Sequence, residues 1–309
     1  MIRFDNLRKE FGDLVAVEGL DAVIPEGEIF GLIGPNGAGK TTTIRMACGL
    51  LEPTGGRAFV AGIDVQEQPE QAHLHIGYLS DFFSVYEDLK VWEYLDYFAH
   101  AHKMDRARIP GRIDQVIHEA GLDVKRDAFI KGLSRGMKQR LGIARAIIHQ
   151  PKVLLLDEPA SGLDPKARME LRDILRALRD NGATILISSH ILTELEGFCT
   201  SIGLMEKGRM VRHGTIAQIT SQAIDHIVVR VNWAGDGSGP VATTLGGHPA
   251  IAGLQVKASE AIFQFSGPRE DLAAVLKDLI GAGVAVVFFG EVKHTVEDLY
   301  LKLSRHEVM

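Results

Sequence analysis

Short apolar runs alternate with glycine-containing turns and helix-like stretches along the first two thirds of the chain. Two of these runs, residues 29–33 and 153–156, are apolar throughout and far too short to cross a membrane. Runs of this kind are typical of buried parallel strands, which are covered on both faces. A helical pattern follows the first run over residues 42–50, and about residues 86–150 are rich in helical patterns. The pattern predicts a doubly wound α/β core with a helical subdomain.

The last third of the chain has a pattern of its own. It predicts three strands, at residues 227–231, 262–265 and 284–289. A linker is predicted at 234–240 and a helix at 269–280. Thr295-Val296-Glu297-Asp298 fits the capping pattern S/T-x-x-D/E and predicts a final helix to about residue 305. We therefore expect two domains, 1–221 and 222–309, the second a small α+β domain. Its role is either to complete the fold or to support dimerisation or regulation.

A glycine-rich loop joins the first apolar run to the helical stretch after it. Its residues fit the pattern G-x-x-x-x-G-K-S/T and are Gly34, Pro35, Asn36, Gly37, Ala38, Gly39, Lys40 and Thr41. The glycines let successive amides point inward, and the following helix adds its positive end, so the loop is suited to hold a polyphosphate. Lys40 would reach the β- and γ-phosphates, and the Thr41 hydroxyl would bind Mg²⁺. Thr42 would be the last residue of the nucleotide-binding stretch.

Two carboxylates, Asp157 and Glu158, follow the second apolar run. At the carboxyl end of a central strand they would lie beside the phosphate loop, where the crevices of doubly wound sheets open. Adjacent residues of a strand point to opposite faces, so the two acids are unlikely to bind the metal in the same way. We assign Asp157 to Mg²⁺ and Glu158 to the attacking water as general base.

Three further motifs follow in a fixed order. They are Leu133-Ser134-Arg135-Gly136-Met137, Ser161-Gly162-Leu163-Asp164 and Ser188-Ser189-His190. Together with the phosphate loop and the two carboxylates, they resemble the signature, D-loop and switch histidine of the nucleotide-binding subunits of ABC transporters, over about residues 1–215. The resemblance implies a P-loop NTPase core of ABC type with an antiparallel β subdomain beside it.

The resemblance also implies roles for single residues. In the signature, usually LSGGQ, Ser134 and Gly136 match whereas Arg135 and Met137 depart. The family places this helix end against the γ-phosphate bound by the other subunit. Ser134 is also a good helix N-cap, so a purely structural role stays open. His190 would contact the γ-phosphate.

Phe11 and Asp81 stand at two other family positions. Phe11 is where the family stacks an aromatic ring on adenine, and a core position is the alternative. Asp81 stands where most members carry the Q-loop glutamine, which senses Mg²⁺ and the water and links to the membrane partner. We hypothesise that Asp81 keeps the metal-sensing role, either by binding the ion or by repelling Glu158 when no nucleotide is bound. The alternative is an ordinary loop acid in a shifted register.

Aromatic residues gather at helical spacing in residues 86–98, with Phe82 and Phe83 just upstream. Such a stripe is often core packing. The resemblance implies a second interpretation, a surface groove that receives a short coupling helix from a membrane partner.

The resemblance further implies a mode of action. Two ATP-binding subunits, most simply two copies of this chain, would close head-to-tail around two ATP molecules with Mg²⁺, and hydrolysis would reset them. Membrane-spanning permease subunits would convert that motion into transport, with this subunit at the cytoplasmic face of the cell membrane. Residues 295–303 resemble the ending of exporter-type subunits, so we expect the transport to be export. The alternatives are an importer motor, a binding-only subunit with impaired hydrolysis, and a soluble ABC ATPase that acts on ribosomes or DNA ends.

Composition narrows these classes. The chain of 309 residues carries a net charge of −6, which argues against a general nucleic-acid binder. Its two cysteines, Cys48 and Cys199, fit a reducing compartment. The N-terminus lacks the apolar core of a signal peptide, and no apolar run approaches the roughly 20 residues of a transmembrane helix. We therefore expect a subunit that does not itself span the membrane.

Overall fold

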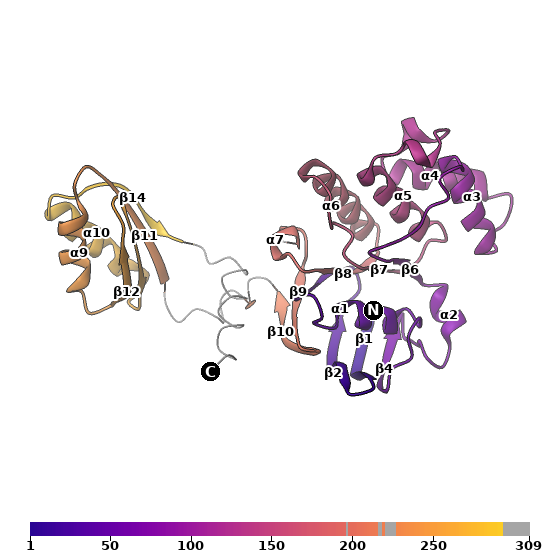
Figure 1. The fold of residues 1–309 in the computed structure, drawn as a ribbon, viewed down its shortest axis with the longest axis horizontal. Helices are drawn as coiled ribbons and strands as arrows, with labels where there is room; N and C mark the ends of the chain where they lie inside the picture. The colour runs from indigo at the N-terminus through magenta and orange to yellow at the C-terminus, as the bar shows by residue number, and fades with distance from the viewer. Residues whose placement is uncertain (196, 216–217, 220–226, 293–309) are drawn as a thin grey trace. The chain divides into compact units, whose positions relative to one another are not determined.

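The computed structural model describes residues 1–195, 197–215, 218–219 and 227–292 (Figure 1). Contacts within the chain divide it into two compact units, Met1–Thr215 and Ile216–Met309. Each unit has a hydrophobic cluster of its own. The predicted domain boundary at 221–222 and the predicted final helix lie outside the described residues.

A six-stranded sheet forms the centre of the first unit. Its strand order is β10-β9-β3-β8-β7-β6, and each neighbouring pair is parallel except β9 and β10. The strands are β3 Ile29–Ile33, β6 Ile76–Leu79, β7 Val153–Leu156, β8 Thr184–Ser189, β9 Ser201–Glu206 and β10 Arg209–Thr215. Both predicted strands, β3 and β7, are buried along their whole length, which explains their uniformly apolar sequences. Because β3, β8 and β7 are neighbours, their carboxyl ends bring three functional loops to one edge.

An antiparallel sheet lies below this core in Figure 1, as the family resemblance implied. Its strands are β1 Ile2–Phe11, β2 Leu14–Ile24, β4 Gly55–Val60 and β5 Ile63–Asp64. Helix α1 (Lys40–Ala47) contacts β2 and β4 of this sheet and β7 of the central one. One hydrophobic cluster includes Leu20 of β2, Ile44 of α1 and Leu155 of β7. The phosphate loop, at the start of α1, is therefore fixed to both sheets.

Helices cover the opposite side of the central sheet (Figure 1). They are α3 Val91–Ala101, α4 Ile109–Glu119, α5 Arg135–Ile147 and α6 Pro165–Asp180, with the shorter α2 Pro69–His73 and α7 Leu192–Leu195 elsewhere in the unit. Helix α5 contacts β6, α3, α4 and α6. It therefore joins the helical part of the unit to the sheet edge.

The helices α5 and α6 begin at side-chain caps next to two of the predicted motifs. The Ser134 hydroxyl accepts a hydrogen bond from the Met137 amide at 3.3 Å, and the Asp164 carboxylate accepts one from the Ala167 amide at 2.8 Å. Pro165 is the first residue of α6. Such caps satisfy amides of the first turn and fix where a helix starts. The signature and D-loop motifs therefore lie at helix N-termini.

The second unit is a small α+β fold. Its antiparallel sheet has the order β12-β13-β11-β14, and α9 and α10 lie on one face of it (Figure 1). The elements are β11 Ile227–Ala234, α9 Ser238–Gly246, β12 Ile251–Val256, β13 Glu260–Phe265, a short 3₁₀ turn Arg269–Asp271, α10 Leu272–Gly281 and β14 Ala285–Glu291. The three predicted strands and the predicted helix are confirmed. The predicted linker at 234–240 is wrong from Ser238 onward, where α9 begins, and β12 was not predicted.

A pair of histidines joins the helical part of the first unit to strand β6. The His149 ring, after α5, stacks on the ring of His102 at the end of α3, with ring centroids 3.9 Å apart. The His149 Nε2 lies 3.0 Å from the Ile76 carbonyl oxygen, so it carries the proton and donates. The Nδ1 atom is buried and has no hydrogen-bond partner. Burial and the neighbouring His102 therefore lower the pKa of His149 to about 4.

We expect acid to weaken this joint. The pKa of His149 is about 4 in the folded chain against an ordinary value of 6.5, so the unfolded chain binds more protons between these pH values. The free energy of unfolding should therefore be highest above pH 6.5 and fall as the pH approaches 4. His149→Gln, whose amide can still donate to Ile76, should flatten the dependence of Tm on pH in this window. The exposed His213→Gln should keep the wild-type slope, and an unchanged slope in His149→Gln would contradict the assignment.

Candidate nucleotide-binding and catalytic site

The phosphate loop turns at positions that only glycine fills without strain. Gly37 and Gly39 have φ values of +83° and +100°, in the left-handed region that favours glycine. A Cβ at Gly39 would lie 2.4 Å from the Ala16 carbonyl oxygen, and one at Gly34 would lie 2.3 Å from that of Met205. The loop is therefore packed tightly on its outer side, which leaves its inner side to face a ligand.

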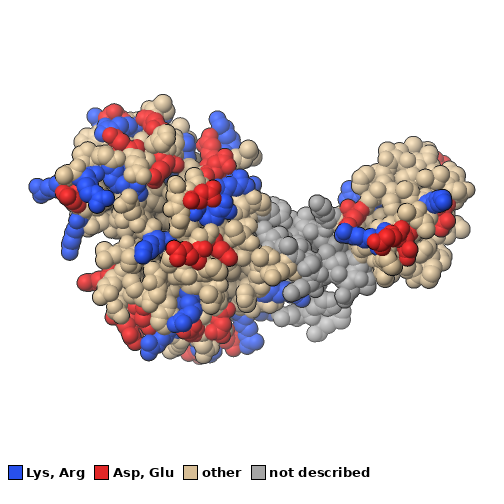
Figure 2. Space-filling model, turned by 180° about the vertical axis from the view of Figure 1, so that it is seen from behind, with Lys and Arg blue, Asp and Glu red and all other residues tan. Residues whose placement is uncertain are grey.

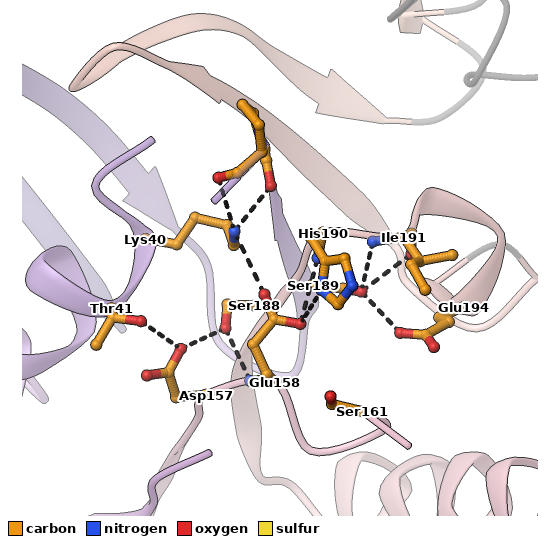
Figure 3. Close-up of polar contacts among 12 residues, drawn as sticks. Lys40, Thr41, Asp157, Glu158, Ser161, Ser188, Ser189, His190, Ile191 and Glu194 are labelled. Atoms are coloured by element: carbon orange, nitrogen blue, oxygen red, sulfur yellow. Dashed lines mark hydrogen bonds and ion pairs between the residues drawn. The ribbon is translucent and has the colours of Figure 1, made fainter. Parts of the chain in front are cut away.

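Lys40 lies at the centre of this loop and is only 5 % exposed. Its Nζ donates to the carbonyl oxygens of Gly34 at 2.7 Å and Pro35 at 3.2 Å, and forms an ion pair with Glu158 Oε1 at 3.3 Å (Figure 3). The ammonium is thus held within the loop and already faces an anion. A phosphate group would meet a preorganised cation here and would compete with Glu158 for it.

Thr41 and Asp157 bring two hard oxygen ligands together from α1 and the end of β7. The Thr41 hydroxyl donates to Asp157 Oδ1 at 3.1 Å, and the Ser188 hydroxyl donates to the same oxygen at 2.7 Å. Asp157 is 2 % exposed. These two hydrogen bonds orient the Asp157 carboxylate. They also stabilise its negative charge, which burial without hydrogen-bond partners would destabilise. Hydroxyl and carboxylate oxygens are ligands that Mg²⁺ prefers in nucleotide sites.

Glu158 is held between a lysine and a histidine. Its Oε1 faces Lys40, and its Oε2 accepts a hydrogen bond from His190 Nδ1 at 2.8 Å (Figure 3). A carboxylate only accepts, so this hydrogen bond places the His190 proton on Nδ1. The Glu158 backbone has a φ of +49°, which is uncommon outside glycine, and its amide donates to Ser188 Oγ at 2.9 Å. Strain of this kind persists where surrounding contacts hold a functional side chain in place.

Asp81 and Phe11 line the same pocket as the phosphate loop and Glu158. Asp81 follows β6, and burial together with the negative charges of Asp157 and Glu158 raises its pKa. The metal-sensing role of Asp81 stays a prediction. Phe11 is 49 % exposed at the end of β1, so it does not lie in the core and its ring is available for stacking.

The signature residues lie apart from this pocket. Ser134 and Gly136 are not among the residues that line it. Arg135, one of the two departures from the family motif, donates from Nη2 to the Ser161 carbonyl oxygen at 2.9 Å. Its guanidinium packs on Gly162, where a Cβ would lie 2.5 Å from it. The signature and the D-loop of one subunit are therefore joined to each other.

Two residues of the site were missed by the sequence reasoning. Ser188 was quoted only as part of the histidine motif, yet it bonds both Asp157 and the Glu158 amide. Glu194 belongs to no motif, yet its buried carboxylate accepts a hydrogen bond from Ser189. For Ser188 the available signal was a hydroxyl at the end of a strand beside β7. Glu194 gave no signal, because the two arginines that contact it, Arg168 and Arg172, belong to α6, which is distant from it in sequence.

The residues present fit ATP and Mg²⁺. The glycine cradle and Lys40 suit a polyphosphate, and Phe11 lies at the same pocket. In the described part of the chain, no group of three His, Cys, Asp or Glu side chains is arranged to hold a metal ion by itself. Mg²⁺ in phosphoryl-transfer sites commonly takes one or two protein ligands and completes its shell with phosphate oxygens and water. Thr41 and Asp157 would supply those protein ligands, with Asp81 near them.

Comparisons with known proteins agree with this geometry. Residues 17–161 match the family model described as ABC transporter. Over 308 residues the chain is 33% identical to the Nod factor export ATP-binding protein I of Cupriavidus metallidurans, and the match covers 100% of this chain and 98% of that protein. The chain belongs to the ABC transporter ATP-binding proteins.

Two further matches cover mainly the first unit. The chain is 37% identical over 223 residues to the probable multidrug ABC transporter ATP-binding protein YbhF of Escherichia coli, which covers 72% of this chain and 38% of that protein. A solved ATP-binding subunit of an ABC transporter superposes with a TM-score of 0.65 at 32% identity, covering 72% of this chain and 92% of that one. The ABC-type P-loop fold is therefore confirmed. This ABC transporter ATP-binding subunit is an ATP hydrolase.

Replacing Asp81 tests whether it senses the metal. If Asp81 contributes to the ion's shell, Asp81→Asn should raise the Mg²⁺ concentration for half-maximal ATP hydrolysis by about 10-fold, the lower end expected for residues that support a metal site. The exposed Asp105→Asn, outside the pocket, should leave it unchanged. The measurement is a Mg²⁺ titration of ATPase activity at saturating ATP. Equal Mg²⁺ dependence of wild type and Asp81→Asn would show that Asp81 is an ordinary loop acid.

Proposed function

We propose that this subunit powers export through separate membrane permease subunits. The observation that carries the proposal is the match to the Nod factor export ATP-binding protein I, which extends over both units of the chain. The name of the YbhF relative, a probable multidrug ABC transporter ATP-binding protein, supports the same direction. No helix among the described residues is long and apolar enough to span a bilayer. In this proposal other chains contribute the permease, and the subunit acts at the cytoplasmic face of the membrane.

Two copies of the chain would form the working unit. Ser134 and Arg135 are exposed at the N-terminus of α5, and the pocket of their own subunit is lined without them. A helix N-terminus with a serine cap is suited to meet a phosphate. These features support a head-to-tail pair in which Ser134 and Gly136 of one subunit face the nucleotide held by the Lys40 loop of the other.

The side chains suggest how hydrolysis proceeds. When bound, ATP with Mg²⁺ supplies the phosphate that is attacked. Lys40 would exchange its contact with Glu158 for the phosphates, which leaves the Glu158 carboxylate to take a proton from the attacking water. In its doubly protonated form, His190 would hold Oε2 of Glu158 through Nδ1 and donate from Nε2 to the γ-phosphate. The intact Lys40, Glu158 and His190 cluster argues against a binding-only subunit.

An exposed aromatic surface is the proposed permease contact. Phe82, Tyr86 and Tyr97 are 89 %, 56 % and 55 % exposed, and the two tyrosines line a pocket with Glu87 and Asp88. Glu87 forms an ion pair with Lys138 of α5 at 2.6 Å. A permease segment docked here would thus contact both the loop after Asp81 and, through Glu87, the signature helix.

The competing classes receive less support. Lys, Arg, Asp and Glu are intermixed over the face of the first unit in Figure 2, which shows no broad basic patch there. A nucleic-acid function would favour such a patch. An importer motor is the remaining alternative, and the name of the Nod factor export relative favours export over it.

The central experiment compares wild type with Glu158→Gln. Wild type should hydrolyse ATP in a Mg²⁺-dependent manner, whereas the variant should lose at least about 100-fold of kcat because the general base is gone. The variant should also accumulate an ATP-bound dimer, detected by light scattering, since closure precedes hydrolysis. Rapid turnover by Glu158→Gln would overturn its role as the base. A variant that neither hydrolyses nor dimerises, beside an equally inactive wild type, would favour the binding-only alternative.

A second prediction addresses the aromatic surface. Phe82→Ala should weaken binding to the permease by about 30-fold, the loss typical of a central aromatic contact. Basal ATP hydrolysis should stay within about twofold, because so exposed a ring contributes little to the fold. Val124→Ala is the matched control, since Val124 is 91 % exposed in a short 3₁₀ helix, Asp123–Lys125. Equal effects of the two variants on permease binding would place the contact elsewhere.

A further inference from the structure

Glu194 is a buried carboxylate just behind the candidate catalytic site. It lies in α7, four residues after His190, and is 4 % exposed. Its Oε2 accepts a hydrogen bond from the Ser189 hydroxyl at 2.8 Å (Figure 3). Its Oε1 lies 3.4 Å from Arg168 Nη2. A buried carboxylate is costly unless its charge is paired, so its presence here calls for a role.

Ser189 transmits this contact to the chain on both sides of His190. The Ser189 hydroxyl has a single proton and two acceptors within reach, Glu194 Oε2 at 2.8 Å and the Ile191 carbonyl oxygen at 3.0 Å. The charged carboxylate is the stronger acceptor, so the hydroxyl donates to Glu194. The same hydroxyl accepts a hydrogen bond from the Ile191 amide at 3.0 Å. The Ser189 carbonyl in turn accepts a hydrogen bond from the Gly34 amide at 3.3 Å. The residues before and after His190 are thus held by one side chain.

The backbone on both sides of His190, held in this way, orients the imidazole towards Glu158. Its amide lies 3.3 Å and its Nδ1 2.8 Å from Glu158 Oε2, so both depend on the path of the chain between Ser189 and Ile191. His190 itself has 37 % of its side chain exposed and is not packed into a core. Its direction therefore depends on the turn rather than on surrounding side chains.

Glu194 also links this turn to helix α6. Besides the ion pair with Arg168, its backbone carbonyl accepts hydrogen bonds from Arg172 Nε at 3.1 Å and Nη2 at 2.8 Å. Helix α6 begins directly after the D-loop, at the cap Asp164. The histidine turn and the helix that follows the D-loop are therefore bound to the same buried residue.

We propose that Glu194 is a positioning residue for ATP hydrolysis, which holds the Ser189–Ile191 turn against α6 and so keeps the His190 imidazole on Glu158. The inference rests on the proposed catalytic roles of Glu158 and His190. Glu194 touches neither residue directly and acts through Ser189. Its negative charge is needed because it must accept from a hydroxyl and face an arginine at the same time.

Glu194→Gln is the discriminating variant because it keeps the shape and removes one acceptor. The amide oxygen of glutamine can face Ser189 or Arg168 but not both. With the NH₂ group at Arg168, two donors face each other, and with the NH₂ group at Ser189 the hydrogen bond reverses and the hydroxyl proton turns to the Ile191 carbonyl oxygen, 3.0 Å away. We expect kcat to fall by about 10-fold to 100-fold, as small displacements of catalytic groups do, with the Kd for ATP within about twofold. Asp173→Asn, on the exposed side of α6, is the matched control and should change neither value.

A measurement on His190 keeps the test independent of turnover. In the full-length chain, Glu194→Gln should move the ¹⁵N resonance of His190 Nδ1 towards its position in Glu158→Ala, where the acceptor is absent. Ser189→Ala should produce the same shift, which covers the case that Glu194→Gln does not fold. An unmoved resonance in a folded variant would overturn the proposal. A shift beside an unchanged kcat would support the positioning of His190 and overturn the proposed catalytic roles of His190 and Glu158.

A double-mutant cycle separates positioning from general stability. In the His190→Ala background, Glu194→Gln should cause no further loss of kcat, because its effect passes through His190. Equal losses in the two backgrounds would show that Glu194 acts on the fold alone.

Discussion

The arrangement of this subunit depends on one carboxylate, Glu158, held between Lys40 and His190. Each partner comes from a different strand end: Lys40 follows β3, Glu158 follows β7 and His190 follows β8. The three strands are neighbours in the parallel sheet, so their loops meet without any long connection. The uncommon backbone conformation of Glu158 is maintained because Ser188, Lys40 and His190 all hold it. The burial of β3 and β7 supplies the rigidity on which this arrangement rests.

Much of this site could be predicted because its chemistry is encoded locally. A phosphate loop needs glycine at Gly39, where a side chain would meet the Ala16 carbonyl, so its pattern is visible in a single segment. The same holds for Asp157 and Glu158, which end an apolar strand. Contacts between distant segments left no such pattern. Glu194 meets Arg168 only after folding, and β12 is a sheet edge whose half-exposed residues lack a clear alternation. The linker prediction failed at Ser238 because the glycines near it did not prevent a helix.

Arg135 and Asp81, two of the departures from the family pattern, interact through their charges. Arg135 joins the start of α5 to the D-loop by donating a hydrogen bond to the Ser161 carbonyl oxygen. Its positive charge also lowers the pKa of Asp81, which burial and the neighbouring carboxylates raise by a larger amount. Glu87 joins the aromatic surface to Lys138, one turn further along α5. A force applied at the aromatic surface would thus reach the signature through one rigid helix. If a permease docks on the aromatic surface as proposed, the Glu87–Lys138 ion pair and the hydrogen bond from Arg135 to Ser161 would connect it through α5 to the signature and the D-loop, although each contact is weak by itself.

The central claim is that each nucleotide is held by one subunit and completed by the signature of the other. Mixing two inactive variants tests it most directly. Lys40→Ala removes the phosphate-loop cation, and Ser134→Arg blocks the signature. In a mixed head-to-tail dimer, the intact phosphate loop of the Ser134→Arg chain meets the intact signature of the Lys40→Ala chain, so one complete site is restored. The account predicts that Mg²⁺-dependent ATP hydrolysis reappears on mixing. A mixture that forms dimers but stays as inactive as its components would contradict it.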